Sequence, residues 1–415
     1  MSLWLLRRLG KWQATDCAAT AAWDLGRWLV QLLQTKQCVA GGSILFPATT
    51  FFHFLGEFPS RQSHPHRHPT MIMGLNQRRR WVLDVKSVVM LGLGLLLAMA
   101  QHTVQLRSNH PMHGIVDRVN EIGGPYIGLV MAYPPEELAL ITSRLFVHNS
   151  RIPFIDLAGR RFNVGKIKNV DVIYVMTGEQ TVNAGITVQI LLDAFDIRGV
   201  VHYGTAGSSN NSLSFGDVSV MKYVAFTGSW KWKAFKSETG QLPELDFGAF
   251  NFPVRGKNLL AKVEFTPSQL YSAGKPMEEL FWLPVDSEWF DIATQLQDLE
   301  LRRCLNDTYC LPETPKVIVG LRGSTADIFL DNAAYREFLF KQFNVSTVDE
   351  ESAAIVMACL SNAVPSIVFR GVSDLGGGSD RLLSISRISL ASVNALRVAA
   401  EFIALIDKNN LVHDQ

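Results

Sequence analysis

Cysteine and net charge are both scarce in this sequence. Its 415 residues include 5 cysteines, and 39 basic against 38 acidic side chains leave a formal net charge of +1. So few cysteines exclude a scaffold held together by disulfides. The charge balance excludes the strong overall field by which a basic protein attracts nucleic acid or an anionic membrane, so we expect no nucleic acid partner.

Apolar residues, in contrast, are plentiful. Hydrophobic residues make up 47% of the chain and charged residues 19%, whereas an average globular protein carries roughly 25% charged residues. The chain therefore has ample material for a buried core, which excludes wholesale disorder. At about 150 residues per domain, the length predicts about 2.8 domains, which we treat as a bound and not as a count.

The first 70 residues predict no folded domain. Their apolar residues follow no sustained period, and the tract Ser63–Pro69 alternates prolines with histidines. Histidines at such a spacing can bind a metal, but proline fixes an extended, solvated backbone. We therefore interpret residues 1–70 as a non-structured extension and expect no metal site.

Residues 71–100 have the layout of a secretory signal peptide. The basic run Arg78–Arg80 precedes an apolar run, Val88–Ala100, that ends in an Ala-x-Ala cleavage pattern. This run is shorter than the ~20 residues that span a membrane. A signal at this position implies that translation begins at Met71 or Met73. We expect entry into the secretory pathway, with an extracellular or vacuolar destination; an uncleaved anchor through residues 88–100 is the alternative.

In the oxidising secretory pathway, cysteines can form disulfides and sequons can be glycosylated. Cys304 and Cys310 flank a short loop that a disulfide could close in such a compartment. N-x-S/T sequons begin at Asn210, Asn306 and Asn344, although chance alone supplies one or two in a chain of this length. The sequence therefore predicts one disulfide and a glycoprotein.

From residue 112 to residue 408, strand-like and helix-like segments alternate. Short apolar runs predict buried strands at 125–131, 170–176, 199–203, 217–221, 316–321 and 366–371, and apolar residues at helical spacing predict helices at 136–146, 182–195, 352–361 and 391–408. This alternation predicts an α/β fold with a largely parallel, helix-covered sheet, which binds ligands at the carboxyl ends of its strands.

One region interrupts the alternation. Residues 228–315 are rich in Trp, Phe, Pro and Lys. Interleaved aromatic and basic residues can stack on nucleic acid bases, but nothing else in the composition supports such a partner. We interpret residues 228–315 as an insertion packed beside the site.

Three groups of acidic residues fall at the end of a strand or the start of a helix. The groups are Glu136-Glu137, Asp349-Glu350-Glu351 and Ser373-Asp374. Asp374 could act as a general acid or, with Ser373, cap a helix. The other two groups could serve catalysis or merely favour a helix dipole. Each group therefore has a catalytic and a structural interpretation.

Four segments, taken in order along the chain, resemble the motifs of the purine and uridine phosphorylase superfamily. They are Ile127–Val130, Gly204–Gly207 with Gly216–Val218, Val348–Ala354 and Val364–Asp374. Within this superfamily they are most similar to methylthioadenosine/S-adenosylhomocysteine nucleosidases and, in the long insertion and secretory start, to plant bark storage proteins. The resemblance covers residues 112–408. It implies a three-layer α/β/α fold with a mixed, mostly parallel sheet, no cofactor, and a homo-oligomer of two or three subunits.

The resemblance implies a role for each acidic group. Asp374, in the family's Ser-Asp position with Ser373, would protonate N7 of a purine so that the base leaves as a neutral species. Glu351 would accept a hydrogen bond from the ribose 2′-hydroxyl and stabilise the positive charge that develops on the sugar. One of Glu136 and Glu137 would activate water, and we favour Glu136.

The same resemblance implies uncharged contacts to the substrate. Thr205 and Gly207 would lie beside the attacking water or anion. Phe329 would stack on the base, and Leu330 would contact the base through its backbone.

Two departures from the family pattern concern the substrate. Glu350 stands where the nucleosidases usually carry a methionine against the ribose, and a second acid there would crowd Glu351 and could raise its pKa. Purine phosphorylases usually bind phosphate with an arginine where this chain has His202, and a neutral imidazole is a weak phosphate anchor. Arg370 could still supply charge, so phosphorolysis is disfavoured and not excluded.

Two classes of function stay open. The first is an enzyme that cleaves a purine nucleoside or a 5′-thioadenosine derivative, with water in a nucleosidase or with phosphate in a phosphorylase that acts on purine or cytokinin ribosides. The second is a vegetative storage protein of the bark type with weak or no activity. Glu350, the signal and the insertion favour storage, whereas the retained acids Asp374, Glu351 and Glu136 oppose it. The order of the motifs indicates one enlarged domain over residues 112–408.

Overall fold

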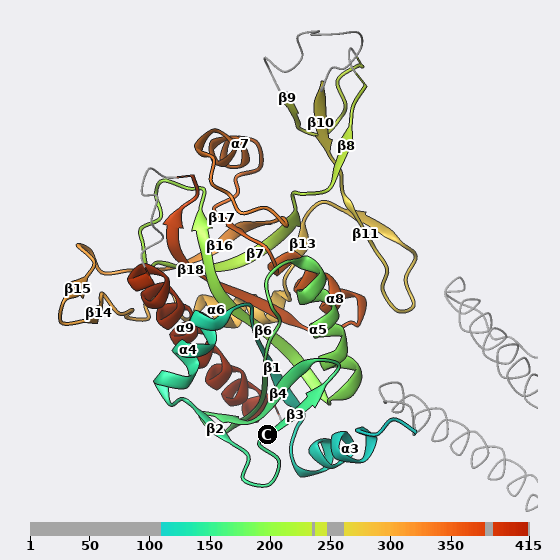
Figure 1. Ribbon diagram of the computed structural model, residues 1–415, viewed down its shortest axis with the longest axis vertical. Helices are drawn as coiled ribbons and strands as arrows, with labels where there is room; N and C mark the ends of the chain where they lie inside the picture. The colour runs from blue at the N-terminus through green and yellow to red at the C-terminus, as the bar shows by residue number, and fades with distance from the viewer. Residues whose placement is uncertain (1–108, 235–236, 247–260, 378–384, 414–415) are drawn as a thin grey trace, which may run out of the picture. The chain divides into compact units, whose positions relative to one another are not determined.

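The computed structural model describes residues 109–234, 237–246, 261–377 and 385–413 (Figure 1). The expected extension over residues 1–70 and the expected signal peptide or anchor over residues 71–100 lie outside these ranges.

Four parallel strands form the middle of a mixed sheet. Their spatial order is β5 (Val170–Met176), β1 (Tyr126–Met131), β6 (Ile197–Ser208) and β18 (Ser366–Leu375). All six residues of β1 are buried. Parallel strands with both faces covered read as continuous apolar runs, which is why the strand was recognisable in the sequence.

Five strands close into a ring. In this ring β6 pairs with β17 (Thr347–Asp349), β17 with β16 (Val317–Thr325), β16 with β7 (Val218–Phe226), β7 with β18, and β18 with β6. The β6–β17 and β7–β18 pairs are antiparallel, and the other three are parallel. The ring brings the C-terminal parts of β6, β17 and β18 together.

Antiparallel strands extend the sheet at both edges. β4 (Arg160–Ile167) pairs with β5 and with both β2 (Phe146–His148) and β3 (Phe154–Leu157), and β13 (Leu283–Pro284) pairs with β7. Within the described ranges the sheet has eleven strands.

Helices cover both faces of this sheet. Successive side chains of a strand point to opposite faces, and Leu129 and Met131 belong to one hydrophobic cluster whereas Val130 belongs to another. The first cluster includes residues of α4 (Pro134–Ser143), α6 (Ser287–Thr294) and α9 (Ile385–His413), the second those of α3 (His113–Ile122) and α5 (Thr181–Ala194), and α8 (Ser352–Ser361) contributes to both. The expected three-layer α/β/α fold is confirmed (Figure 1).

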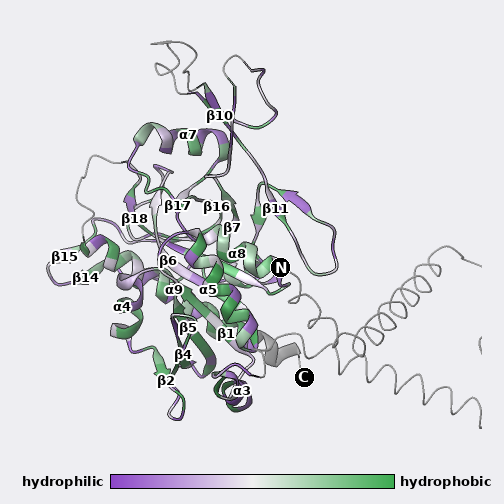
Figure 2. Ribbon diagram, turned by 45° about the vertical axis from the view of Figure 1, so that its right-hand side comes forward, coloured by the Kyte–Doolittle hydropathy of each residue, from purple (hydrophilic) through white to green (hydrophobic). Residues whose placement is uncertain are grey.

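Hydropathy follows this layering. Hydrophobic residues concentrate in the strands and helices around β1 and α5, and hydrophilic residues mark the hairpin at β11 (Figure 2). The Ile385–Lys408 part of α9 is long and apolar enough to span a membrane, but its most apolar window is 61% buried. Because α9 packs against β18 and β6, its apolar face serves the core.

Most of the predicted elements are present, and two coincide with their predicted bounds. These are β5 and α8. The helix predicted over 136–146 ends earlier, at Ser143, because Arg144 adopts a left-handed φ of 55° and the chain enters β2 at Phe146. The short strands β2, β3 and β17 and the helices α3 and α7 (Ala333–Phe343) were not predicted.

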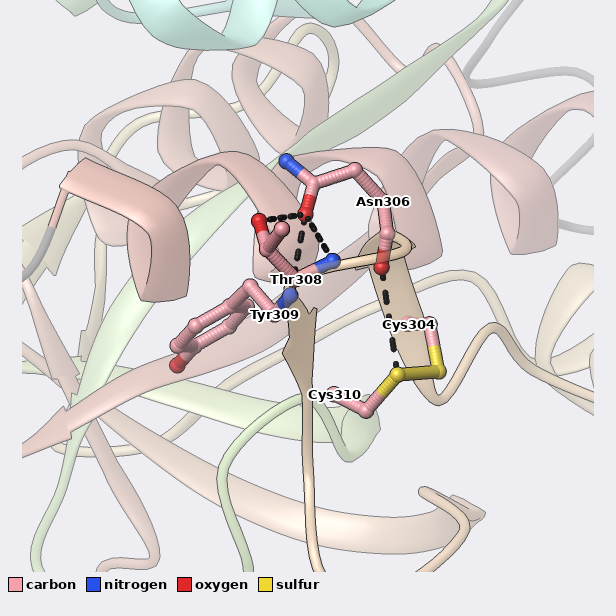
Figure 3. Close-up of a disulfide and its surroundings, with 5 residues drawn as sticks. All are labelled: Cys304, Asn306, Thr308, Tyr309 and Cys310. Atoms are coloured by element: carbon pink, nitrogen blue, oxygen red, sulfur yellow. Dashed lines mark hydrogen bonds between the residues drawn. A yellow bond between two sulfur atoms is a disulfide. The ribbon is translucent and has the colours of Figure 1, made fainter.

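The segment expected as an insertion has two parts. The first forms a three-stranded sheet of β8 (Trp230–Trp232), β9 (Glu244–Asp246) and β10 (Lys262–Phe265), followed by a hairpin of β11 (Ser268–Leu270) and β12 (Glu278–Leu280). The second returns to the main fold, where α6 packs Trp289 and Ala293 into the core. It ends in the hairpin of β14 (Cys304–Asn306) and β15 (Tyr309–Cys310), which the Cys304–Cys310 disulfide closes (Figure 3).

Candidate active site

The predicted site residues, apart from Glu137 and Arg370, line one cavity of about 230 Å³. They are Glu136, Thr205, Gly207, Phe329, Leu330, Glu350, Glu351, Ser373 and Asp374. They come from the start of α4, from β6 and β18, from the junction between β17 and α8, and from the loop between β16 and α7. The fold thus joins positions that lie more than 200 residues apart in the sequence.

Glu136 is the member of its pair that faces the cavity. Only 1% of its surface is exposed, and its carboxylate accepts hydrogen bonds from the backbone amides of Ala132 (2.7 Å) and Thr205 (2.7 Å) and from the Thr205 hydroxyl (3.2 Å). Glu137 does not line the cavity; its carboxylate bonds to Tyr174 instead. The side-chain directions on α4 therefore separate two residues that the sequence left as alternatives.

Arg370 holds the acids together from beneath the cavity. It is fully buried on β18, and its guanidinium lies 2.8 Å from Glu351, 3.2 Å from Asp349 and 3.9 Å from Glu136. It also donates to the Thr205 carbonyl (3.2 Å). Its donors are thus engaged by the acids and by a carbonyl, and it does not line the cavity, so Arg370 acts on the site by positioning the acids.

Asp349, not Glu351, satisfies the start of α8. One Asp349 oxygen accepts from the amides of Glu351 (3.1 Å) and Ser352 (3.0 Å), and the other accepts from the Ser352 hydroxyl (2.7 Å). Glu351 occupies the N-cap position without a capping bond from its side chain. The Glu351 carboxylate is therefore free to line the cavity, where it accepts from the Gln180 amide (3.2 Å).

The shared arginine leaves the three acids with more negative charge than it can neutralise. Burial raises the pKa of Glu136, opposed by Arg370 and by backbone amides. Burial, with Asp349 and Glu136 nearby, raises the pKa of Glu351 to about 7 although Arg370 opposes it. A proton is therefore available to this group near neutral pH, which is the condition for a carboxylate to exchange protons with a reactant.

Gly204 allows this close packing. A Cβ atom at Gly204 would lie 2.4 Å from Nη1 of Arg370 and 2.5 Å from Oε1 of Glu136. Because real Cβ atoms essentially never approach so closely, only glycine fits here. At Gly207, nearer the cavity, a Cβ would lie 3.1 Å from Cγ2 of Val348 and 3.3 Å from the Asp374 carboxylate, so a larger residue would require these neighbours to shift slightly.

Asp374 lies within β18 and does not cap a described helix. The Ser373 hydroxyl donates to its carboxylate (2.7 Å) and lies 3.3 Å from the Ala206 carbonyl. Burial raises the pKa of Asp374, with the Ser373 hydrogen bond opposing. A carboxyl that keeps its proton to higher pH is suited to donate it to a leaving group.

The loop after β16 supplies an aromatic wall. Phe329 lines the cavity with 64% of its surface exposed, and Leu330 beside it is buried. The loop is tied to the start of α5, because Asp327 accepts from the Thr181 amide (2.8 Å) and hydroxyl (2.9 Å). An exposed ring at a cavity edge can stack on a planar base.

Sequence reasoning missed several residues that line the cavity. They include Tyr133, Glu179, Ile328 and Ile388. Glu179 comes three residues after the predicted strand 170–176, so the strand-end argument used for the other acids would have found it.

His202 does not lie at the cavity surface. It is fully buried in β6, and its Nδ1 lies 3.0 Å from the Val130 carbonyl. Burial, assisted by Arg370, lowers the pKa of His202 to about 3, so the ring is neutral, in agreement with its expected weakness as a phosphate anchor. Within the described ranges, no group of three or more His, Cys, Asp or Glu is arranged to hold a metal ion.

Comparison with known proteins finds relatives that match most of the described chain. A family model described as the phosphorylase superfamily matches residues 126–406. Bark storage protein A of Populus deltoides is 41% identical over 308 residues, which cover 74% of this chain and 96% of that protein. A 5′-methylthioadenosine/S-adenosylhomocysteine nucleosidase of Staphylococcus epidermidis is 26% identical over 253 residues, covering 61% and 87% of the two chains.

One similar solved structure is a nucleosidase of the same name from Colwellia psychrerythraea, in complex with adenine. It aligns with a TM-score of 0.49 and 21% identity, covering 68% of this chain and 95% of the other.

Proposed function

Because this chain belongs to the phosphorylase superfamily, we propose that it hydrolyses the N-glycosidic bond of a purine nucleoside or of a 5′-thioadenosine derivative. The observation that carries this proposal is the placement of three carboxylates in one cavity. Glu136 and Glu351 share Arg370, whereas Asp374 stands apart beside Ser373. Different surroundings suit carboxylates to different roles.

The reaction assigns one step to each carboxylate. Glu136 takes a proton from water while the water oxygen bonds to C1′ of the sugar. The bond from C1′ to the base breaks, and its electron pair stays with the base, which accepts a proton at N7 from Asp374. Glu351 accepts a hydrogen bond from the ribose and stabilises the positive charge that develops on the sugar ring.

Hydrolysis is favoured over phosphorolysis by the charges at the cavity. The described residues that line it include no lysine, arginine or histidine. Arg370 is engaged by acids and by the Thr205 carbonyl. A phosphate dianion would therefore meet carboxylates, and no described lining residue supplies a cation to offset them.

Turnover of candidate substrates tests this function. We expect the purified protein to release free base from at least one of methylthioadenosine, adenosine, inosine and a cytokinin riboside, without a requirement for phosphate. Asp374→Asn should lower kcat at least 100-fold, since general acid catalysis contributes about 10²- to 10⁴-fold, whereas Asp193→Asn, on the exposed far end of α5, should not. Base release that needs phosphate and yields ribose 1-phosphate would support a phosphorylase.

Storage is the second candidate function. The 41% identity to a bark storage protein over 96% of that protein's length favours it. Storage requires abundance and not a working cavity, so the two functions are compatible. The absence of base release from every substrate tested would leave storage as the better account.

A further inference from the structure

Acidic side chains dominate the polar lining of the cavity. Its described lining residues include six carboxylates and no cationic side chain; the six are Glu136, Glu179, Asp349, Glu350, Glu351 and Asp374. Four of them have an assigned partner, because Arg370 holds three and Ser373 donates to Asp374. Glu179 and Glu350 have no role in the proposed reaction.

Neither of these two carboxylates is neutralised by its surroundings. Among the described residues, no hydrogen bond or ion pair reaches the side chain of Glu179 or Glu350, whereas Asp327 nearby is engaged by Thr181. Burial raises the pKa of Glu350, and the charges of Glu179 and Asp327 raise it further. Glu179 and Glu350 are thus close enough to repel each other.

Both carboxylates lie beside the residue assigned to the sugar. Glu350 directly precedes Glu351 in the chain, and the residue after Glu179, Gln180, donates its amide to the Glu351 carboxylate (3.2 Å). Glu179 and Glu350 therefore reach the cavity from two elements, the β5–α5 loop and the β17–α8 junction, that meet at Glu351. A sugar held by Glu351 places its substituents next to them.

We infer that Glu179 and Glu350 select the charge of the substrate's sugar substituent. A purine nucleoside with an ammonium or sulfonium group on the sugar binds more tightly than its neutral counterpart, and a nucleoside phosphate binds least. This inference rests on the proposed function, since it takes Glu351 as the ribose ligand. Two carboxylates within about 5 Å of a charged group, partly screened by water, account for a tenfold or larger preference.

Calorimetric binding to the full chain tests this selection separately from turnover. The ligands share one base and one sugar: 5′-amino-5′-deoxyadenosine, adenosine and adenosine 5′-monophosphate, titrated near neutral pH at low ionic strength, where screening is weak. The titrations use the Asp374→Asn variant, so that bound ligand is not consumed. We expect the amine to bind at least tenfold more tightly than adenosine, and the phosphate at least tenfold more weakly.

Variants that remove the two charges test whether Glu179 and Glu350 cause this order of ligand affinities. The double variant Glu179→Gln/Glu350→Gln is made in the Asp374→Asn background. The ratio of the Kd of the phosphate to the Kd of the amine should be at least tenfold smaller in it than in Asp374→Asn alone. Asp193→Asn, which removes a carboxylate from the far end of α5, should leave the order unchanged. High salt should weaken the preference in the parent protein alone.

Three results would overturn the inference: equal or reversed affinities in the parent, an unchanged order in the double variant, or no binding of any of the three ligands. If the wild-type chain releases no base but the binding order and its dependence on Glu179 and Glu350 hold, the hydrolytic function fails and the charge selection stands.

Discussion

At the scale of single residues, the site depends on which donor each carboxylate meets. Asp349 takes the capping bonds of α8, so Glu351 can reach both Arg370 and the Gln180 amide. The sequence shows three adjacent acids before a helix and cannot assign these tasks, because the assignment depends on side-chain directions set by β17. Arg370 was noted in the sequence only as a source of charge; its position among three acids required the register of β18 against β6.

Gln180 provides a test of backbone strain at this site. It adopts φ 80° and ψ 158°, a region that is essentially restricted to glycine and costs other residues about 1–3 kcal/mol. Its amide nevertheless donates to Glu351. Gln180→Gly should therefore raise the free energy of unfolding by about 1 kcal/mol in urea titrations. This value already subtracts the entropy that glycine adds to the unfolded chain. Because the backbone amide keeps its bond to Glu351, kcat should change by less than about threefold.

Gln189→Gly is the matched control in the same helix. Gln189 lies inside α5, where its side chain bonds to Asp193 (2.9 Å). Glycine there should destabilise the protein by about 1 kcal/mol. Loss of stability in both variants would show that Gln180 is not strained.

At the scale of elements, part of the insertion supports the wall of the cavity. Phe265 of β10 stacks on Phe338 (5.6 Å between centroids), and both Phe265 and Phe281 lie 5.1 Å from Phe343 of α7. Leu330, which lines the cavity, belongs to the same cluster. The aromatic composition of residues 228–315 pointed to such packing. The strands there were not predictable, because each has only two to four residues, too few to show an alternating pattern.

Phe343→Leu should therefore change substrate binding more than chemistry. Removal of this ring leaves a gap among Phe265, Phe281 and Phe338, which loosens the loop that carries Leu330. We expect KM to rise about threefold or more with kcat nearly unchanged, because the catalytic carboxylates lie on other elements. Steady-state kinetics on the substrate that the turnover test identifies would measure KM and kcat separately.

A control in the other core separates this effect from general destabilisation. Phe195 is fully buried, and its ring centroid lies 5.2 Å from that of Phe162. Both rings belong to the core on the face of the sheet that α3 and α5 cover. Phe195→Leu should lower Tm by a few degrees, about as much as Phe343→Leu does, without changing KM. If both variants raise KM equally, the insertion has no specific influence on the cavity.

At the scale of the whole molecule, the sheet collects acidic residues that the sequence scatters. The parallel strands were predictable, since each is a continuous apolar run. The ring of β6, β17, β16, β7 and β18 was not, because it depends on antiparallel pairs between β6 and β17 and between β7 and β18. It is this ring that brings Gly207, Val348 and Asp374 to one cavity. In the folded protein Glu136, Glu351 and Asp374 therefore hold protons more strongly than they do in the unfolded chain.

These raised pKa values predict a contribution to stability that falls as pH rises. The pKa of Glu351 is about 7 in the folded protein against an ordinary value of 4.5, and burial also raises the pKa values of Glu136 and Asp374. Between pH 4.5 and pH 7 the folded state therefore binds protons that the unfolded state has lost. The stability gained from Glu351 is fully present below its unfolded pKa and is lost as pH rises through its folded pKa.

Between about pH 5 and pH 8 the urea midpoint of the wild type should therefore decrease relative to that of Glu351→Gln, whatever that variant's absolute stability, because its side chain no longer titrates. His202 acts in the opposite direction in both proteins, since burial lowers its pKa to about 3 in the folded state, so the comparison of the two slopes tests Glu351. Glu337→Gln is the control. Lys341 lowers the pKa of Glu337 on the exposed face of α7, so Glu337 is ionised in both states throughout this range and its replacement should leave the slope unchanged. A slope in Glu351→Gln equal to that of the wild type would show that Glu351 does not hold a proton in the folded protein, and the shared proton of the site would have to be assigned elsewhere.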